Sequence, residues 1–384
     1  MNNYRFIGLF LLLAACNSAG NQAPVQKATT VTTFIGTYTR KEGHVDGKGA
    51  GIYVFSQDSS SGYLDELLVE EDIVNPSFLI PSHDGKFLYA AEEIGPAVDT
   101  VGHVVAYAWD GKALQKINSQ SSHAFAPCHL STDSQGRYVF VANYVGGTVA
   151  ILPIDENGGL KPASDVIKLS GKGPHARQDS SHPHSVNLSP DEKYLYVPDL
   201  GTDRINIFQV DYQNGKLVPA NPAFIAMQPG AGPRHFTFHP VQSYAYVINE
   251  LNNTITALRW QKETGALDTI QSVPTLPADF QAQNTTSDIH ITPNGQFLYG
   301  ANRGHNSIAG YKIDVNNGQL TPIGHTPTQG EIPRNFAISP DGRFLYAANQ
   351  NSDNILIFKI GADGQLQYQN EVKTPTPVCV QFVR

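Results

Sequence analysis

Charged residues and methionine are scarce in this sequence of 384 residues. Asp, Glu, Lys and Arg together make up 16% of the chain, and methionine occurs twice, whereas a typical soluble domain carries about 25% charged residues. This scarcity argues against the long charged helices of a bundle or a coiled coil. Turn-forming residues are abundant instead, with 34 glycines and 25 prolines. The composition therefore predicts an all-β protein with many turns.

A run of basic residues is also absent. Lys and Arg number 26 against 34 Asp and Glu, which gives a formal net charge of −8 at pH 7. Proteins that bind a phosphate backbone carry clustered Lys and Arg on one face. We therefore expect no nucleic-acid partner.

The N-terminal hydrophobic run is too short to cross a bilayer. Arg5 precedes ten apolar residues, Phe6–Ala15, whereas a membrane-spanning helix needs about 20. A basic residue followed by a short apolar run is typical of a signal peptide. We predict that residues 1–15 are a signal peptide and that the protein is exported.

The run ends in Leu-Ala-Ala-Cys, Leu13–Cys16, which resembles the bacterial lipobox. This resemblance implies lipidation of Cys16 and cleavage just before it, so that a lipid anchor holds the protein on a membrane. Asn17 in place of Asp indicates the outer membrane or a periplasm-facing lipoprotein, and residues 16–30 suit a polar tether. Ordinary secretory cleavage, with Cys16 as an incidental thiol, is the alternative.

Few cysteines are left for other roles. Cys128 and Cys379 are 251 residues apart and form no CxxC or Cys/His zinc pattern. No HExxH motif is present, so we expect no metal site and no cofactor. The two thiols fall in non-neighbouring repeats, beyond disulfide reach, and both are predicted to be buried and free.

A repeated strand pattern runs through the chain. Its aromatic anchors recur at intervals of 47 to 56 residues and are Phe34, Tyr89, Phe140, Tyr196, Tyr246, Tyr299 and Tyr346. Each unit has room for about four strands and shows no convincing amphipathic helix. The sequence therefore predicts an all-β, seven-bladed β-propeller over residues 31–384.

The first repeat lacks an innermost strand. In five other repeats a proline stands thirteen residues before the anchor, for example Pro127 and Pro233, but nothing comparable precedes Phe34. The C-terminal segment Pro377–Phe382 has the missing pattern. We predict that it completes the first blade and closes the ring, which protects the open sheet edges.

Two positions in each blade are expected at one mouth of the central channel. They are the residue after the proline and the residue four beyond the anchor. Charged groups at these positions crowd into four consecutive blades and are His184, Arg234, Glu250, Arg303 and Arg334, with Glu93 alone elsewhere. A structural ring should be repetitive, so this asymmetry indicates a site. The alternative is a hydrated channel mouth with ion pairs that satisfy one another.

The sequence also resembles the seven-bladed β-propeller lactonases, such as the propeller type of 6-phosphogluconolactonase and the carboxymuconate lactonising enzyme. The matching stretches are Asn143–Val149, Arg177–Gln178, His182–His184, Pro198–Ile205, Gly232–His235, Asn249–Leu251 and Asn302–His305. This resemblance implies a catalytic set of His184, Arg234, Glu250 and Arg303. The candidates for substrate binding are Arg334 from the ring and Asn143, Tyr144 and His235 from the matched stretches.

Lactone hydrolysis needs an activated water and donors for the developing oxyanion. Arg234 and Arg303 can supply forked donors, and either Glu250 or His184 can take the proton. We therefore expect a lactonase acting on a sugar-derived lactone or a related organic acid. The alternatives are a carboxymuconate-type cycloisomerase and a non-catalytic binding propeller of the cell envelope.

Overall fold

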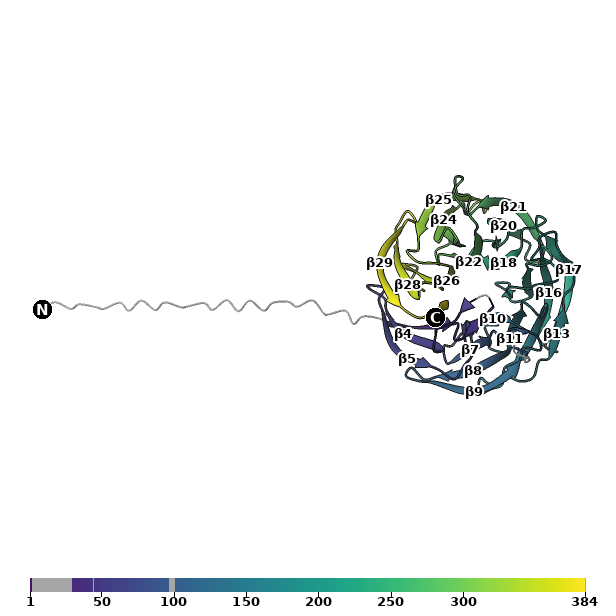
Figure 1. The fold of residues 1–384 in the computed structure, drawn as a ribbon, viewed down its shortest axis with the longest axis horizontal. Helices are drawn as coiled ribbons and strands as arrows, with labels where there is room; N and C mark the ends of the chain where they lie inside the picture. The colour runs from purple at the N-terminus through teal and green to yellow at the C-terminus, as the bar shows by residue number, and fades with distance from the viewer. Residues whose placement is uncertain (2–29, 44, 97–100, 384) are drawn as a thin grey trace.

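The computed structural model describes residue 1 and residues 30–383, apart from residue 44 and residues 97–100. Seven four-stranded antiparallel sheets stand as blades around a central axis, and the chain passes around the ring once (Figure 1). The prediction of an all-β, seven-bladed propeller is confirmed. Cys16 and nearly all of the predicted signal peptide and tether lie outside the described residues.

Each blade has four strands, which follow one another from the channel outward. The first blade consists of β30 (Pro377–Phe382), β1 (Thr30–Thr37), β4 (Ile52–Asp58) and β5 (Leu64–Glu70), and the second of β6 (Pro76–Pro81), β7 (Phe87–Glu92), β8 (His103–Trp109) and β9 (Leu114–Ser121). The third blade consists of β10 (Pro127–Thr132), β11 (Tyr138–Asn143), β12 (Thr148–Pro153) and β13 (Asp165–Lys168), and the fourth of β14 (Asn187–Leu188), β15 (Tyr194–Asp199), β16 (Arg204–Asp211) and β17 (Lys216–Ala226).

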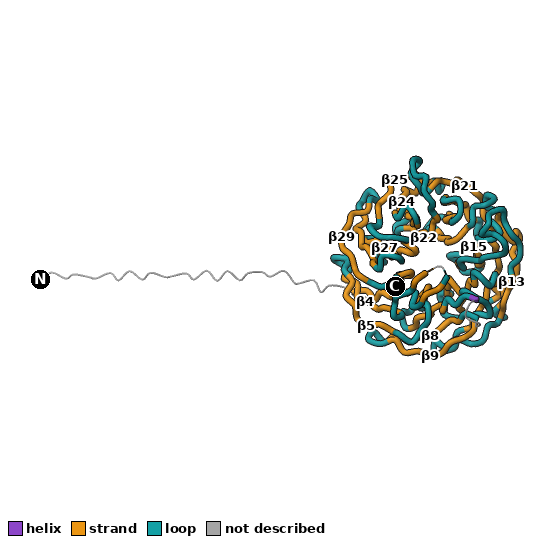
Figure 2. Tube along the Cα trace, viewed as in Figure 1, coloured by secondary structure: helices purple, strands orange, loops and turns teal. Residues whose placement is uncertain are grey.

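The fifth blade consists of β18 (Pro233–Phe238), β19 (Tyr244–Asn249), β20 (Thr254–Trp260) and β21 (Leu267–Pro274), and the sixth of β22 (Thr285–Ile291), β23 (Phe297–Arg303), β24 (Ser307–Ile313) and β25 (Leu320–Pro327). The seventh blade consists of β26 (Pro333–Ile338), β27 (Phe344–Asn349), β28 (Asn354–Ile360) and β29 (Leu366–Lys373). A short hairpin joins β2 (Lys41–Glu42) to β3 (Val45–Asp46). Figure 2 shows these strands linked by loops.

The C-terminal strand closes the ring as predicted. Strand β30 pairs antiparallel with β1, so that Gln381 lies opposite Phe34 and Val380 opposite Ile35. The first and last segments of the chain thus share one blade, where purple meets yellow in Figure 1. This pairing provides hydrogen-bond partners for the backbone groups at the inner edge of β1, which would otherwise be open to other strands.

Each of the five anchor tyrosines ties its blade to the next one. The hydroxyl of Tyr196 donates to the carbonyl oxygen of Gly265 at 2.6 Å, and Tyr346 in the last blade donates to Gly62 in the first at 2.7 Å. Gly62 has a φ of +79°, and a Cβ there would lie 2.7 Å from the ring of Phe344. This turn therefore requires glycine, because other residues disfavour the positive φ and their Cβ atom would collide with Phe344.

The hydrophobic core is divided among the blade interfaces. One cluster joins Tyr196 and Ile207 of the fourth blade to Phe236 and Val247 of the fifth. Similar clusters fill the other interfaces, because each strand alternates its side chains between the two faces of its sheet. Within the described part of the chain, no helix is long and apolar enough to span a membrane.

Candidate active site

Five innermost strands, β30, β6, β10, β18 and β26, carry a β-bulge beside a proline. In β10 the pairing with β11 passes from Pro127 to His129 and skips Cys128. The pairings of β18 and β26 skip Arg234 and Arg334 in the same way. A bulge takes one residue out of the regular alternation and re-aims its side chain. This local geometry explains why the residue after the proline can turn toward the channel in these blades.

Backbone hydrogen bonds fix the other predicted position of each blade, the residue four beyond the anchor. The N–H group of Tyr144, just after β11, donates to the carbonyl oxygen of Ala126 at 2.8 Å, and that of Glu250, just after β19, donates to Gly232 at 2.7 Å. Both acceptors belong to the connection that enters the innermost strand of the same blade. The two predicted positions of a blade are thereby held side by side.

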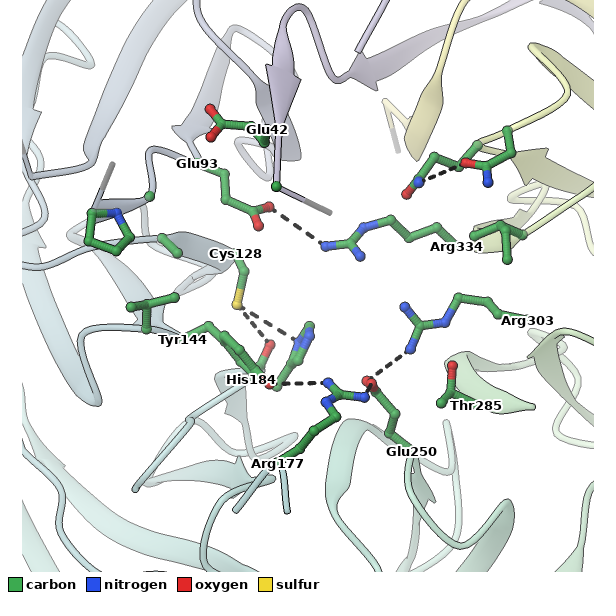
Figure 3. Close-up of a pocket in the computed structure, with 18 residues that line it drawn as sticks. Glu42, Glu93, Cys128, Tyr144, Arg177, His184, Glu250, Thr285, Arg303 and Arg334 are labelled. Carbon is green, nitrogen blue, oxygen red and sulfur yellow. Dashed lines mark hydrogen bonds and ion pairs between the residues drawn. The ribbon is translucent and has the colours of Figure 1, made fainter. Parts of the chain in front are cut away.

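Residues at these two positions of the blades line a cavity of about 630 Å³ at one mouth of the channel. Figure 3 shows side chains from blades on opposite sides of the ring pointing into it. The lining residues labelled there are Glu42, Glu93, Cys128, Tyr144, Arg177, His184, Glu250, Thr285, Arg303 and Arg334. Five predicted site residues are in this set: His184, Glu250, Arg303, Arg334 and Tyr144.

Arg234 lies deeper than the other predicted arginines. Its side chain is 2% exposed and sits against Glu250, and it lines a void of about 10 Å³ at the axis together with Ser77 and Arg334. Its Nη1 atom also donates to the carbonyl oxygen of Ser287. Arg234 therefore supports the floor of the cavity rather than its wall.

Two predicted substrate-binding residues are not in the cavity. The Asn143 amide is fully buried and donates to the carbonyl oxygen of Ser122 and to Thr148 Oγ1, both at 3.0 Å, so it fastens the turn that follows β11. His235 lines a different cavity on the channel side of β18. Its imidazole is held there by Asp288, whose Oδ1 atom lies 2.7 Å from His235 Nδ1.

Glu250 is the centre of the charge cluster. Its Oε2 atom lies 2.9 Å from Arg234 Nε and 3.0 Å from Arg303 Nη2, and its Oε1 atom accepts a hydrogen bond of 2.5 Å from Arg177 Nη1. The Nε–H bond of Arg234 is not directed at a hydrogen-bond acceptor, so this contact is an ion pair. One nearly buried carboxylate thus organises three guanidinium groups.

The cluster keeps Glu250 ionised. Burial alone would raise the pKa of the carboxyl group, but the charges of Arg303, Arg234 and Arg177 outweigh it and lower the pKa to about 2. Burial and the nearby Arg303 lower the pKa of Arg234 to about 10. All these groups are therefore charged at neutral pH.

His184 is the neutral group of the cavity wall. Burial and the positive charge of Arg234 hold the pKa of its imidazole well below the usual value of 6.5. Its Nδ1 atom lies 3.8 Å from Cys128 Sγ, and burial raises the pKa of that thiol, so it stays protonated. A neutral imidazole keeps one ring nitrogen as a proton acceptor.

The opposite wall holds a second ion pair. Arg334 Nη2 lies 3.7 Å from Glu93 Oε2, and the same carboxylate oxygen accepts a hydrogen bond of 2.9 Å from the hydroxyl of Tyr38. The Arg334 guanidinium also lies over the Tyr38 ring, 5.3 Å from its centroid. Glu93, isolated in the sequence pattern, thus pairs with Arg334 from the other side of the first blade.

The repeat pattern assigned no role to Arg177. This residue lies in the long connection between β13 and β14, outside the repeated positions, yet it lines the cavity and contacts Glu250. The shared stretch Arg177–Gln178 was the signal that could have identified it. Glu42, from the short β2–β3 hairpin, is a second lining residue that the pattern did not include.

A second cavity of about 400 Å³ includes His235, His129 and Asp288 in its wall. His235 Nδ1 lies 2.7 Å from Asp288 Oδ1, and His290 Nε2 lies 3.0 Å from Asp288 Oδ2. Burial, followed by the charge of Arg234, lowers the pKa of His235 to about 4. The described residues contain no group of three or more His, Cys, Asp or Glu side chains arranged to hold a metal ion. Cys128 and Cys379 are buried and free, as predicted.

Residues 32–382 match the family model described as "Lactonase, 7-bladed beta-propeller". The chain belongs to this family. The predicted resemblance is confirmed, and with it the prediction of an enzyme that hydrolyses lactones.

Several relatives are similar over most of the chain. A 6-phosphogluconolactonase of Bacillus subtilis is 35% identical over 91% of this chain and 97% of its own length. One from Formosa agariphila is 38% identical over 79% of this chain and 85% of its own. The solved structure of Pseudomonas aeruginosa periplasmic gluconolactonase is 33% identical, covers 93% of this chain and 99% of its own, and superposes with a TM-score of 0.86.

Proposed function

We propose that this lactonase hydrolyses a sugar-derived lactone in the channel-mouth cavity. The observation that carries the proposal is the pairing of Arg234 and Arg303 with the buried Glu250 at the edge of a cavity of about 630 Å³. Donors that are fixed before the substrate arrives stabilise a developing oxyanion without reorganisation. The volume lies within the range of about 300–1,000 Å³ that small-molecule sites occupy.

His184 is the better general base of the two candidates. With a pKa of about 2, the Glu250 carboxylate has little affinity for a proton at neutral pH, and protonating it would leave three arginines without their counter-charge. His184 is neutral and lines the same cavity. We therefore assign proton transfer to His184 and the positioning of the arginines to Glu250.

The proposed reaction consumes one water. His184 accepts a proton from water as its oxygen attacks the lactone carbonyl carbon, and Arg303 stabilises the negative charge on the carbonyl oxygen. Arg303 Nη2 is engaged by Thr286 and Glu250, so Nη1 is the terminal nitrogen left for the substrate. The ring C–O bond then breaks, and the proton on His184 passes to the leaving oxygen. The product is the open hydroxy acid.

The names of the relatives support a sugar lactone as the substrate. Two are 6-phosphogluconolactonases and one is a periplasmic gluconolactonase, and their named substrates share the gluconolactone ring.

The test is turnover of glucono-1,5-lactone and its 6-phosphate by the purified protein. Arg303→Ala should lower kcat/KM by about two to three orders of magnitude, the scale of losing one oxyanion donor, and His184→Gln by about 10²- to 10⁴-fold. Arg259→Ala, an exposed arginine of β20, is the control and should retain full activity. Full activity in both Arg303→Ala and His184→Gln would contradict the site assignment.

We also propose that the protein is exported and anchored by a lipid on Cys16. The support is the short apolar run that ends in Leu13–Cys16, together with the periplasmic location in the name of one relative. Cells fed a palmitate analogue should label the wild-type protein but not Cys16→Ala. Label that persists in Cys16→Ala would contradict the anchor.

A further inference from the structure

The cavity carries an excess of positive charge in an acidic protein. The chain has a formal net charge of −8, yet the charged groups at the cavity are Arg177, Arg234, Arg303 and Arg334 against Glu93 and Glu250. Glu42 is already paired, at 2.7 Å, with Arg40. Two positive charges therefore have no carboxylate of their own, and a concave site of one sign concentrates ligands of the opposite sign.

Arg177 differs from the other three arginines in its exposure. Its side chain is 45% exposed, whereas those of Arg303 and Arg334 are 12% and 14% exposed. In Figure 3 it lies at the edge of the cavity between Glu250 and Tyr144, and its Nη2 atom donates to the Tyr144 hydroxyl at 3.2 Å. An exposed guanidinium can change partners at a lower cost than a buried one, because water replaces the lost hydrogen bonds.

Glu250 does not depend on Arg177 for its charge balance. Its Oε2 atom is paired with Arg234 and Arg303 at 2.9 and 3.0 Å, and Arg177 reaches the other oxygen. A third cation on a single carboxylate is more than charge neutrality requires. Arg177 can therefore serve a ligand while Glu250 keeps two buried partners.

The backbone beside Arg177 is firmly held. Gln178 is 1% exposed, and its Nε2 atom donates to the carbonyl oxygen of Leu200 at 2.8 Å and to Asp203 Oδ1 at 2.7 Å. The loop is thus fixed at the residue that follows the arginine. Binding a ligand at the rim of the cavity would therefore require only the long side chain of Arg177 to move.

We propose that Arg177 is a specificity-determining residue that binds an anionic group on the substrate. The inference rests on the proposed lactone hydrolysis: the lactone ring lies between His184 and Arg303, and a phosphate or carboxylate elsewhere on the sugar meets Arg177 at the rim. The planar guanidinium matches either anion with two parallel hydrogen bonds. The preferred substrates are therefore anionic sugar lactones.

The test compares three lactones: glucono-1,5-lactone, its 6-phosphate and a glucarolactone that carries a carboxylate. The readout is the ratio of kcat/KM for each anionic lactone to that for the neutral one. Arg177→Gln should lower the ratio for the preferred anion by about ten- to hundredfold, the value of one charged hydrogen bond. The loss should fall mainly on KM, because Arg177 is remote from the reacting bond. The anion with the larger loss identifies the natural group.

Two further variants separate this role from others. Arg177→Lys keeps the positive charge but not the paired donors of the guanidinium, so its ratio of kcat/KM values should lie between those of Arg177→Gln and the wild type. Lys172→Gln removes one positive charge from the same loop, at an exposed side chain outside the cavity lining, and should leave the ratio unchanged. If Lys172→Gln lowers this ratio as much as Arg177→Gln does, only the overall positive potential of the loop matters, and the proposal is overturned.

The remaining outcomes are also decisive. If Arg177→Gln lowers kcat/KM equally for the neutral and anionic lactones, Arg177 acts through Glu250 and the proposal is wrong. An unchanged ratio overturns it as well. If the wild type hydrolyses only the neutral lactone, the specificity inference fails while the proposed function stands. If the wild type hydrolyses none of the three lactones, the proposed function itself fails.

Discussion

Glu250 and Arg234 form an ion pair in which both partners are almost completely buried. Their side chains are 3% and 2% exposed, and Oε2 lies 2.9 Å from Nε. A buried pair of this kind contributes little relative to apolar packing, but removing one partner leaves an uncompensated charge in a medium of low polarity. The role of Glu250 in positioning the arginines and its role in stability are therefore linked.

Replacing Glu250 by Gln should lower the free energy of unfolding by about 3–5 kcal/mol, because Arg234 and Arg303 lose their common counter-charge. Chemical denaturation at pH 7 measures the change. Glu66→Gln on β5, where the side chain is exposed, is the matched control and should lie within about 0.5 kcal/mol of the wild type. Equal stability of the two variants would show that the cluster does not depend on Glu250.

The stability should fall as the solution is acidified, in part because of His235. Its pKa is about 4 in the folded protein and about 6.5 in an unfolded chain, so between these values the unfolded state binds more protons. The contribution is complete above pH 6.5 and declines by up to about 1.4 kcal/mol per pH unit down to pH 4.

Replacing His235 by Asn should make the stability curve less steep between pH 6.5 and pH 4, as measured by urea denaturation at several pH values. The exposed His83 offers the control, because His83→Asn should leave the slope unchanged. A slope that is identical in His235→Asn and the wild type would count against a neutral, buried His235.

The activity should persist in mildly acidic solution. Burial and Arg234 hold the pKa of His184 well below 6.5, so the proposed base does not become protonated as the pH falls through that value. The acid limb of kcat/KM should therefore lie below pH 6.5. Initial rates from pH 8 to pH 4.5, corrected for spontaneous lactone opening, test this expectation. A limb centred at or above pH 6.5 would exclude His184 as the base.

Ring closure should be essential for the fold. Deleting residues 376–384 removes β30 and opens the first blade, so the truncated protein should aggregate or unfold at a lower temperature. The smaller change Tyr346→Phe removes the hydroxyl group that donates to Gly62 and should cost about 1 kcal/mol. Thermal unfolding measures both, and a truncated chain with the wild-type midpoint would contradict closure.

The repeated features of the molecule could be predicted from the sequence. The anchors from Phe34 to Tyr346 set the number of blades, because one strand period and one turn signal recur in every unit. The same register identified the channel-mouth positions of His184, Glu250 and Arg303. These inferences succeed since they depend on local rules: the alternation of side chains along a strand and the conformations allowed in a turn.

The tertiary structure alone decided how those residues meet. Arg177 contacts Glu250 across 73 residues of sequence, from a loop that follows no repeat, and Arg334 meets Glu93 across the ring closure. Whether a charge is buried depends on neighbours from several blades, so the burial of Arg234 could not be inferred from its strand alone. The sequence determined the ring and the positions that face its channel, and the packing of the blades determined which charges pair, because pairing depends on distances that no local pattern encodes.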